Sequence, residues 1–547
     1  MLSTMMQFPL TLTSILERAG RLFGPVEIVS RLPDRSLRRS TYADLARRSR
    51  LLAGALDAAG VGPGERVATL MWNDAWHLEA YFGIPASGRV VHTLNPRLHP
   101  DDLAYIIKEA GDTLLIVSDS LLPVYEKLRA RAPVERVLVV PTTGQPVPAG
   151  CEDYEKFLER GSEGYRFPQL NEYDAAMICY TSGTTGTTGV PKGVVYSHRA
   201  LVLHSFCIAL PDVFALSQTG CVLPVVPMFH VNAWGIPYAA TMVGMKQVLP
   251  GPHLDAASLL ELLESEGVTR TAGVPTVWFG VLDLLERQPG RWKLPPDLLA
   301  VVGGAALPQA MVQTFDRLGI AVRQAWGMTE LTPVGTVSIP RSYMADWPAE
   351  QRLAIRAKQG SQVPFMEIRA MSGDREVPWD GESMGELQVR GPWVAAGYFS
   401  HTGNMQCWTG GGWFRTGDVV TIDPDGYVKI TDRTKDLIKS GGEWISSVDL
   451  ENALVGHPPV REAAVIAVPH PRWQERPLAA VVLKDGCTAT AEELRAHLAA
   501  SFSSWQLPDA FVFVPEIPRT SVGKMQKSRL RETFAGWQWT GAARGAE

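Results

Sequence analysis

The sequence predicts an α/β fold in which a large N-terminal domain of α/β subdomains and a β-rich subdomain precede a small α+β C-terminal domain. Helix and strand patterns alternate in the N-terminal part. Thr41 and Asp44 form a capping box ahead of a helical apolar face. Apolar runs at residues 66–71, 113–117 and 136–140 predict buried strands, with helix-like segments between them. This alternation indicates largely parallel sheets.

A different pattern begins near Val363 and predicts the β-rich subdomain. Residues 386–390 and 427–430 have the composition of strands, and Gly-rich turns separate them. The next segment, residues 432–436, is charged and has no apolar periodicity. Such a segment is typical of a surface linker.

The C-terminal part predicts a small α+β unit. Apolar runs at residues 463–468 and 478–483 predict strands, and Thr490 is placed to cap a helix. We therefore expect an N-terminal domain over residues 1–431 and a C-terminal domain over residues 432–547.

Length, composition and charge exclude several classes of function. The 547 residues exceed what one hydrophobic core accommodates, so several structural units are expected. A net charge of −5 and a pI of about 6.2 give no electrostatic reason to bind nucleic acid. The six cysteines are scattered without a C-x-x-C pair, and the N-terminus lacks the regions of a signal peptide. These observations predict a cytoplasmic protein.

Residues 221–245 contain no charged side chain, and two structures fit such a stretch. It has the length of a membrane-spanning helix. However, prolines and polar side chains interrupt it and would leave polar groups unmatched in lipid. These residues are Pro224, Pro227, His230, Asn232 and Pro237. The sequence therefore predicts the buried wall of a cavity and no membrane span.

The segment from Thr181 to Gly193 reads TSGTTGTTGVPKG. Its closely spaced glycines let backbone N–H groups approach a ligand, and with the hydroxyls and Lys192 they suit a polyphosphate. A flexible Gly/Thr linker has a similar composition. Residues 177–180 and 194–196 predict strands, however, so the segment is held at both ends. It matches neither a Walker A loop nor the G-x-G-x-x-G dinucleotide turn.

This segment resembles the phosphate loop of the acyl-adenylate-forming superfamily, which includes acyl-CoA synthetases, luciferases and nonribosomal adenylation domains. Further segments similar to motifs of that superfamily follow in the expected order over nearly the whole chain. They are GGAA at 303–306, WGMTE at 326–330, GEL at 385–387, GY at 397–398, WFRTGD at 413–418, residues 432–445 and PRTSVGK at 518–524. The resemblance is especially close to bacterial medium- and long-chain fatty acyl-CoA synthetases and methylthiopropionate-CoA ligases.

The resemblance implies a ligase that uses ATP, Mg²⁺ and CoA to activate a small-molecule carboxylic acid as acyl-AMP. A carboxylate that attacks the α-phosphorus of ATP brings two anions together, so the site has to neutralise charge and align the reactants. Lys524 is implied as the cation that bridges the acyl carboxylate and the α-phosphate. Glu330 and Thr184 are implied as metal ligands, and His230 as a residue that orients the acyl group.

The resemblance also implies binding residues for each substrate. Those for ATP and AMP are Thr184, Thr185, Gly186, Thr187, Thr188, Gly189, Lys192, Gly304, Ala305, Gln324, Trp326, Gly327, Thr329, Asp418 and Arg433. Those for the acyl group are Val231 and Trp234. Those for the acceptor tunnel are Lys439, Gly441, Gly442 and Trp444.

Two features depart from the family pattern. Trp326 stands where a tyrosine is usual, and either ring can stack on adenine. The Thr-Thr-Gly unit occurs twice, which lengthens the loop by three residues. The entropic cost of this extension is small, a few tenths of a kcal/mol by rough estimate. It leaves open which threonines contact phosphate.

The resemblance also leaves alternatives open. CoA is the favoured acceptor, because residues 439–445 are retained as the CoA ligases have them. Some relatives instead pass the acyl group to an amino acid and form an amide. A further alternative, from another class of protein, is a protein that binds adenylates without catalysing a reaction. A homodimer is compatible with the family. The small C-terminal domain is expected to be mobile and to swing about Asp432 between two half-reactions.

Overall fold

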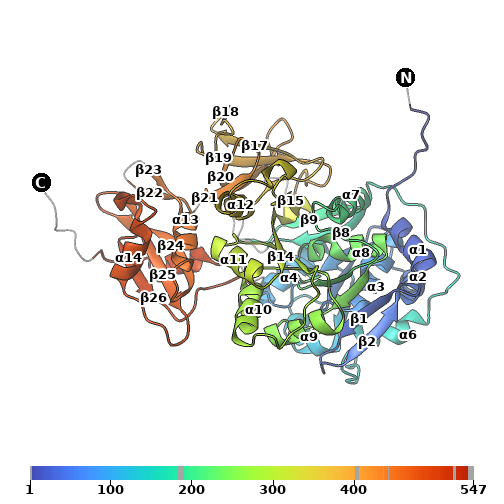
Figure 1. Ribbon diagram of the computed structural model, residues 1–547. Helices are drawn as coiled ribbons and strands as arrows, with labels where there is room; N and C mark the ends of the chain where they lie inside the picture. The colour runs from blue at the N-terminus through green and yellow to red at the C-terminus, as the bar shows by residue number, and fades with distance from the viewer. Residues whose placement is uncertain are drawn as a thin grey trace, which may run out of the picture.

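Four β-sheets organise the chain in the computed structural model, which describes residues 3–181, 190–400, 406–434, 436–440, 443–520 and 525–539. Figure 1 shows two large sheets with their helices in the main body, a β-rich unit beside them and a separate C-terminal unit. This arrangement confirms the predicted α/β fold with a small α+β C-terminal unit.

A seven-stranded sheet occupies the first part of the body, with strand order β7-β6-β5-β3-β4-β8-β9. Its strands are β3 (Arg66–Leu70), β4 (Val90–Thr93), β5 (Leu114–Ser118), β6 (Arg136–Val140), β7 (Glu152–Asp153), β8 (Ala175–Tyr180) and β9 (Gly193–Ser197). All neighbours are parallel except β8 and β9, which pair antiparallel. The predicted strands on both sides of the Gly/Thr loop are therefore confirmed.

A nine-stranded sheet forms the second layer, in the order β16-β15-β14-β13-β12-β10-β11-β1-β2. Its strands are β1 (Glu27–Arg31), β2 (Leu37–Thr41), β10 (Cys221–Pro224), β11 (Lys246–Leu249), β12 (Arg270–Gly273), β13 (Leu299–Gly303), β14 (Ala321–Gly327), β15 (Val334–Val337) and β16 (Ser361–Gln362). The strands from β1 and β11 through β10, β12 and β13 to β14 are parallel. Their carboxyl ends therefore lie on one edge, where α/β sheets bind ligands.

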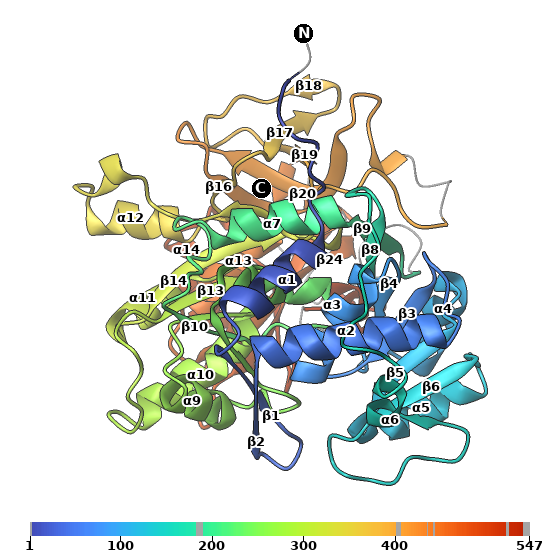
Figure 2. The ribbon, with the colours of Figure 1, turned by 90° about the vertical axis from the view of Figure 1, so that its right-hand side faces the viewer.

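Twelve α-helices accompany these sheets within the described residues. They are α1 (Leu12–Leu22), α2 (Tyr42–Ala58), α3 (Ala75–Ala86), α4 (Pro100–Ala110), α5 (Leu122–Arg129), α6 (Tyr154–Leu158), α7 (His198–Ala209), α8 (Ile236–Val243), α9 (Ala256–Ser265), α10 (Pro275–Arg287), α11 (Gln309–Arg317) and α12 (Ala349–Arg356). Figure 2 shows α1, α2 and α7 on one side of the body. The predicted capping box of Thr41 and Asp44 is confirmed at the start of α2.

An antiparallel five-stranded sheet forms the β-rich unit and confirms that prediction. Its strands are β17 (Glu367–Ser372), β18 (Arg375–Glu376), β19 (Gly385–Arg390), β20 (Phe414–Ile422) and β21 (Val428–Arg433). The C-terminal unit contains β22 (Ile438–Ser440), β23 (Glu443–Ile445), α13 (Ser447–Val455), β24 (Val460–His470), β25 (Gln474–Leu483), α14 (Ala491–Ala499), β26 (Ala510–Phe513) and α15 (Lys527–Thr533). Thr490 caps α14 as predicted, in a capping box with Glu493.

The predicted surface linker at residues 432–436 is wrong at both ends, because Asp432 and Asp436 are buried. Strand β21 continues through Arg433, and only 1% of Asp432 is exposed. The Asp432 carboxylate accepts hydrogen bonds from the backbone N–H and the hydroxyl of Ser447, at 2.8 and 2.6 Å. These donors lie fifteen residues further along the chain, so local composition does not indicate the burial of Asp432.

The uncharged stretch of residues 221–245 is packed inside the body, as expected. It contributes β10 and α8, and most of its apolar side chains are buried. Among the described residues, no helix is both long and apolar enough to cross a membrane.

A buried ion pair joins two helices of the body and supplies a test of the packing. Arg48 of α2 contacts Glu79 of α3 at 2.6 Å and Glu155 of α6 at 2.7 Å. Burial raises the pKa of Glu79, and the Arg48 guanidinium opposes that shift. We expect Arg48→Met to lower the free energy of unfolding by about 3 kcal/mol, because it leaves the Glu79 carboxyl buried without its cation. Denaturant unfolding followed by fluorescence measures the change.

The matched control is Arg287→Met. Arg287 pairs with Asp283 at 3.0 Å on the exposed face of α10. Exposed pairs of this kind contribute little to stability, so the unfolding midpoint of the control should not move. An equal loss in both variants would contradict the role given to the Arg48–Glu79 pair.

Candidate active site

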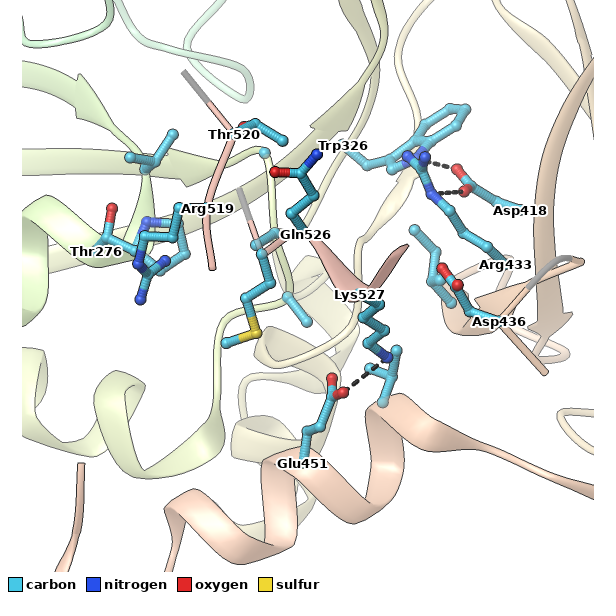
Figure 3. A pocket seen from close by; sticks show the side chains of 18 of the residues that line it. Thr276, Trp326, Asp418, Arg433, Asp436, Glu451, Arg519, Thr520, Gln526 and Lys527 are labelled. Atoms are coloured by element: carbon cyan, nitrogen blue, oxygen red, sulfur yellow. Dashed lines mark hydrogen bonds and ion pairs between the residues drawn. The ribbon is translucent and has the colours of Figure 1, made fainter. Parts of the chain in front are cut away.

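A pocket of about 280 Å³ lies at the carboxyl ends of three parallel strands. Val274 follows β12, Gly304 follows β13, and Trp326 with Gly327 ends β14, and all four residues line the pocket. The opposite walls come from β20 and β21 of the β-rich unit and from α13 and α15 of the C-terminal unit. Figure 3 shows side chains from these three parts converging on one space.

The pocket brings together many of the residues predicted from the sequence. Those that line it are His230, Gly304, Ala305, Gln324, Trp326, Gly327, Thr329, Glu330, Asp418 and Arg433. They come from segments between His230 and Arg433 that lie far apart along the chain. Eight of the predicted nucleotide-binding residues therefore share one pocket with Glu330 and His230.

Two glycines are required by the backbone around the pocket. Gly304 adopts a φ of +84°, a left-handed conformation that disfavours side chains. A Cβ atom on Gly327 would lie 2.0 Å from the carbonyl oxygen of Pro333. Any side chain at position 327 would therefore push apart β14 and the start of β15. Gly304 and Gly327 therefore allow the backbone segments beside the pocket to pack closely.

Asp418 is fixed at the junction of the nine-stranded and five-stranded sheets. The indole N–H of Trp326 donates to one of its carboxylate oxygens at 2.9 Å. The guanidinium of Arg433 contacts the other oxygen at 3.2 Å, because β20 and β21 place Asp418 and Arg433 directly opposite each other. Figure 3 shows both contacts. The carboxylate is thus oriented toward the pocket, with lone pairs left to accept from a diol.

Glu330 provides a buried carboxylate on the same edge. It belongs to a short 3₁₀ turn after β14 and is 2% exposed. The phenol of Tyr398 donates to it at 2.6 Å, while the hydroxyl of Tyr196 donates to the carbonyl of Thr329 at 2.7 Å. Burial, followed by the charge of Glu330, raises the pKa of Tyr398, so the phenol stays protonated as a donor. The two tyrosines hold the turn and its carboxylate in place.

Tyr398 also faces Lys192, the lysine at the end of the Gly/Thr loop. The Lys192 ammonium lies 4.9 Å from the centre of the Tyr398 ring, within the range of a cation–π contact. Thr181 accepts a hydrogen bond from the backbone of Lys192 at 3.1 Å, which joins the two ends of the loop. Lys192 is 3% exposed. Tyr398 therefore connects the end of the predicted phosphate loop to the predicted metal ligand.

Sequence reasoning identified the Gly397-Tyr398 motif without giving Tyr398 a role. The role becomes apparent only from two contacts in the structure, that of the Tyr398 hydroxyl with Glu330 and that of the Tyr398 ring with Lys192. The only signal in the sequence was the place of this motif in the series that resembles the superfamily.

The predicted acyl-pocket residues occupy an unusual turn beside the site. Residues 231–235 all have positive φ values, from 45° to 74°, and only the last is a glycine. Such left-handed backbone is costly for residues with side chains. His230 lines the pocket, whereas Val231 and Trp234 do not, and Trp234 instead packs close to Gly303. A role of Val231 and Trp234 in acyl binding stays a prediction.

The predicted acceptor residues lie elsewhere in the C-terminal unit. Lys439 of β22 and Trp444 of β23 contact each other, with 4.6 Å from the ammonium to the ring centre. Neither lines the pocket, and Trp444 is 41% exposed. Several predicted residues lie outside the described residues: Thr184, Thr185, Gly186, Thr187, Thr188, Gly189, Gly441, Gly442 and Lys524.

The side chains of the pocket fit a magnesium ion held jointly with phosphate. In the part of the chain that the structure describes, no group of three or more His, Cys, Asp or Glu residues is arranged to hold a metal alone. Mg²⁺ that binds with nucleotides needs only one or two carboxylates, since phosphate oxygens and water complete its shell. Glu330, buried and oriented by Tyr398, suits that requirement.

The fold and the pocket define a nucleotide-binding α/β protein with a second, C-terminal unit over its site. Residues 25–399 match the family described as AMP-binding enzyme, and residues 449–524 match the AMP-binding enzyme C-terminal domain. The chain therefore belongs to the AMP-binding enzyme family.

Curated relatives match along almost the whole chain. The long-chain-fatty-acid–CoA ligase of Thermus thermophilus is 51% identical, over 98% of this chain and 97% of the relative. The medium-chain-fatty-acid–CoA ligase of Ectopseudomonas oleovorans and the 3-methylmercaptopropionyl-CoA ligase of Ruegeria pomeroyi are each 43% identical, over 98% of this chain and 98% and 99% of the relatives.

Solved structures show the same architecture. The anthranilate CoA ligase AuaEII in complex with anthranoyl-AMP is similar with a TM-score of 0.84 and 25% identity, over 96% of this chain and 98% of that one. The amide bond synthetase McbA from Marinactinospora thermotolerans is similar with a TM-score of 0.81 and 26% identity, over 96% and 99% of the two chains.

The contact between Tyr398 and Glu330 predicts an effect on metal binding. We expect Tyr398→Phe to raise the Mg²⁺ concentration needed for half-maximal ATP binding by about tenfold, because groups that orient metal ligands typically matter to that extent. The ring above Lys192 is retained, so ATP binding at saturating Mg²⁺ should change little. Titration calorimetry at several Mg²⁺ concentrations measures both quantities.

Tyr343→Phe is the matched control for this variant. The Tyr343 phenol also donates to a carboxylate, that of Asp425 at 2.8 Å, but it lies outside the pocket. Its Mg²⁺ dependence should equal that of the unsubstituted protein. A Tyr398→Phe variant with unchanged Mg²⁺ dependence would show that the phenol does not position Glu330.

Proposed function

We propose that the chain is an ATP-dependent carboxylic acid–CoA ligase that forms an acyl-AMP intermediate. The observation that carries this proposal is the convergence of Asp418, Trp326 and Glu330 in one pocket of a chain that belongs to the AMP-binding enzyme family. Its full-length similarity to named fatty-acid–CoA ligases supports CoA as the acceptor and an apolar acid as the substrate.

In the first half-reaction, a carboxylate oxygen attacks the α-phosphorus of ATP and pyrophosphate leaves. Asp418 accepts hydrogen bonds from the ribose hydroxyls, and Trp326 stacks on adenine. Lys192 and the threonines of the Gly/Thr loop bind phosphate oxygens. Glu330 would hold Mg²⁺, which would supply positive charge to the phosphates. Lys524 is proposed to bridge the acyl carboxylate and the α-phosphate, where negative charge develops.

In the second half-reaction, the CoA thiol attacks the acyl carbon, and AMP leaves with the electrons of the mixed anhydride bond. We assign residues 1–431 to the domain that holds ATP and the acid, and residues 432–547 to a domain that rotates about Asp432. Lys439, Gly441, Gly442 and Trp444 are proposed to receive the pantetheine arm after that rotation. The outward position of Lys439 and Trp444 is compatible with such a movement.

The acyl group is proposed to lie against His230, Val231 and Trp234. The stretch around them has no charged residue and is largely buried, so it favours apolar acids. A cytoplasmic location is consistent with the six unbridged cysteines. We also propose that the protein forms a homodimer. Sedimentation of the purified protein measures its mass in solution and tests this proposal.

Amide formation is the second candidate function. Two observations favour it: the similarity to the amide bond synthetase McbA, and the three-residue extension of the Gly/Thr loop. In that reaction the amino group of an amino acid replaces the CoA thiol as the nucleophile, while the first half-reaction is unchanged.

A competition between acceptors separates the two functions. We expect octanoate, ATP, CoA and a mixture of amino acids to yield octanoyl-CoA, AMP and pyrophosphate, as determined by mass spectrometry. The thioester should form only in the presence of CoA. An N-octanoyl amino acid as the main product would instead establish the amide-forming alternative.

The role given to Lys524 predicts that its loss affects one half-reaction. We expect Lys524→Ala to slow pyrophosphate release from octanoate and ATP by about a hundredfold or more, because it removes a charge that stabilises the transition state. Octanoyl-CoA formation from preformed octanoyl-AMP should stay near the unsubstituted rate. Equal losses in both steps would contradict the assignment.

A further inference from the structure

The turn of residues 231–235 follows His230 directly and is strained. Its φ values lie between 45° and 74°, and only its last residue is a glycine. Left-handed backbone is an outlier for a β-branched or bulky residue, and Val231 and Trp234 are of these kinds. Such strain persists only where the surrounding structure determines it, and it concentrates at functional sites. The turn therefore depends on the contacts that hold its backbone.

Hydrogen bonds join the turn to His230 itself. The backbone N–H of Ala233 donates to the carbonyl of His230 at 3.2 Å, and the N–H of Ile236 donates to the carbonyl of Ala233. Before His230, the N–H of Met228 donates to the buried side chain of Asn73 at 2.7 Å. His230 lies between these two anchored segments and lines the pocket. A change in the turn therefore moves the backbone from which the His230 side chain enters the pocket.

Asn232 supplies the side-chain contact at the start of the turn. It is fully buried, and its Oδ1 accepts a hydrogen bond from the Cys179 thiol at 3.3 Å. Burial raises the pKa of Cys179 to about 11, so the thiol stays protonated and can donate at neutral pH. The Thr93 hydroxyl lies 3.4 Å from the same sulfur. Cys179 belongs to β8 and Thr93 ends β4, so Asn232 joins the turn to the seven-stranded sheet.

An asparagine is otherwise a poor choice for this buried position. Its Nδ2 has no hydrogen-bond partner among the described residues, and a buried donor without a partner costs free energy. Leucine has the same number of side-chain heavy atoms and carries no such cost. Asparagine, however, tolerates left-handed backbone better than most residues with side chains, and it provides the acceptor for Cys179. Both of these advantages concern the conformation of the turn.

The end of the turn packs closely against two further elements. A Cβ atom on Gly303, which ends β13, would lie 3.2 Å from the ring of Trp234. A Cβ atom on Gly235 would lie 2.6 Å from Nδ1 of His204 in α7. The turn is therefore held by β8 near its start and by β13 and α7 at its end.

We propose that Asn232 is a positioning residue that holds the strained turn through its contact with Cys179 and thereby directs His230 into the pocket. Asn232 does not line the pocket, so it acts through its neighbours. The inference rests on the proposed function, in which the acyl group lies against His230, Val231 and Trp234. Loss of the Asn232 side chain therefore weakens the binding of the acid.

Other contacts hold the nucleotide side of the pocket. Two hydrogen bonds between Thr181 and Lys192, at 2.9 and 3.1 Å, join the ends of the Gly/Thr loop. Asp418 is held by Trp326 and Arg433. These contacts do not involve the turn, so a change at Asn232 should affect the acid and spare ATP.

The experiment measures pyrophosphate release from octanoate and ATP in Asn232→Leu and Asn232→Gly. Leucine disfavours the left-handed backbone and cannot accept from Cys179, so we expect it to raise the KM for octanoate by about tenfold or more. Glycine permits the backbone and lacks only the acceptor, so the increase should be smaller, about threefold. The KM for ATP should not change in either variant.

A second pair of variants tests the contact from the side of the strand. Cys179→Ala removes the donor and should raise the KM for octanoate about as much as Asn232→Gly does. Cys179→Ser keeps a donor and should restore most of the unsubstituted value. Neither variant alters the sequence of the turn, so this pair decides the question even if Asn232→Leu does not fold.

Gln474→Leu is the matched control. Gln474 also carries an amide and adopts a left-handed φ of 68°, but it is exposed at the first residue of β25 and does not line the pocket. Its KM values for octanoate and ATP should equal those of the unsubstituted protein. A merely structural role of Asn232 would lower the amount of active protein, and hence the apparent kcat, without moving the KM for octanoate.

The outcomes separate this inference from the proposed function. A rise in the KM for octanoate in Cys179→Ala that spares ATP and is reversed in Cys179→Ser supports the inference. An unchanged KM for octanoate in Cys179→Ala, or equal rises for octanoate and ATP, overturns it and leaves the proposed function intact. An unsubstituted protein that forms no acyl-AMP from any apolar acid overturns the proposed function itself.

Discussion

The contact between Asp418, Trp326 and Arg433 is the interaction on which the site depends. Trp326 ends a strand of the nine-stranded sheet, and Asp418 and Arg433 belong to the five-stranded sheet. One carboxylate, proposed to bind ribose, is therefore held by side chains from two different sheets. The turn that carries Glu330 begins three residues after Trp326, at Thr329. The contact of Asp418 with Trp326 and Arg433 therefore links the packing of the two sheets to the geometry of the site.

The charges around the pocket are arranged in two groups. On one side, Tyr398 connects Glu330 to Lys192 at the end of the Gly/Thr loop. On the other side, Lys527 at the start of α15 donates to the Ser447 hydroxyl, which in turn donates to Asp432. In the first group, the phenol of Tyr398 orients the buried carboxylate of Glu330. Preorganised charge of this kind stabilises a transition state without having to reorient during the reaction.

Much of the architecture could be predicted from the sequence, because local patterns specify it. The strand at residues 136–140 and the capping boxes at Thr41 and Thr490 depend on neighbouring residues alone, and all three are confirmed. Ten of the predicted site residues line one pocket, whereas Val231 and Trp234 do not. The burial of Asp432 and the role of Tyr398 could not be predicted, because their partners come from distant elements.

The central claim is that the carboxylate of an acid attacks the α-phosphorus of ATP in this pocket. Transfer of an oxygen label tests it most directly. With octanoate that carries ¹⁸O in both carboxyl oxygens, the account predicts that the AMP released after one turnover contains one ¹⁸O atom in its phosphate, as measured by mass spectrometry. Unlabelled AMP, or label found in pyrophosphate or inorganic phosphate, would contradict it.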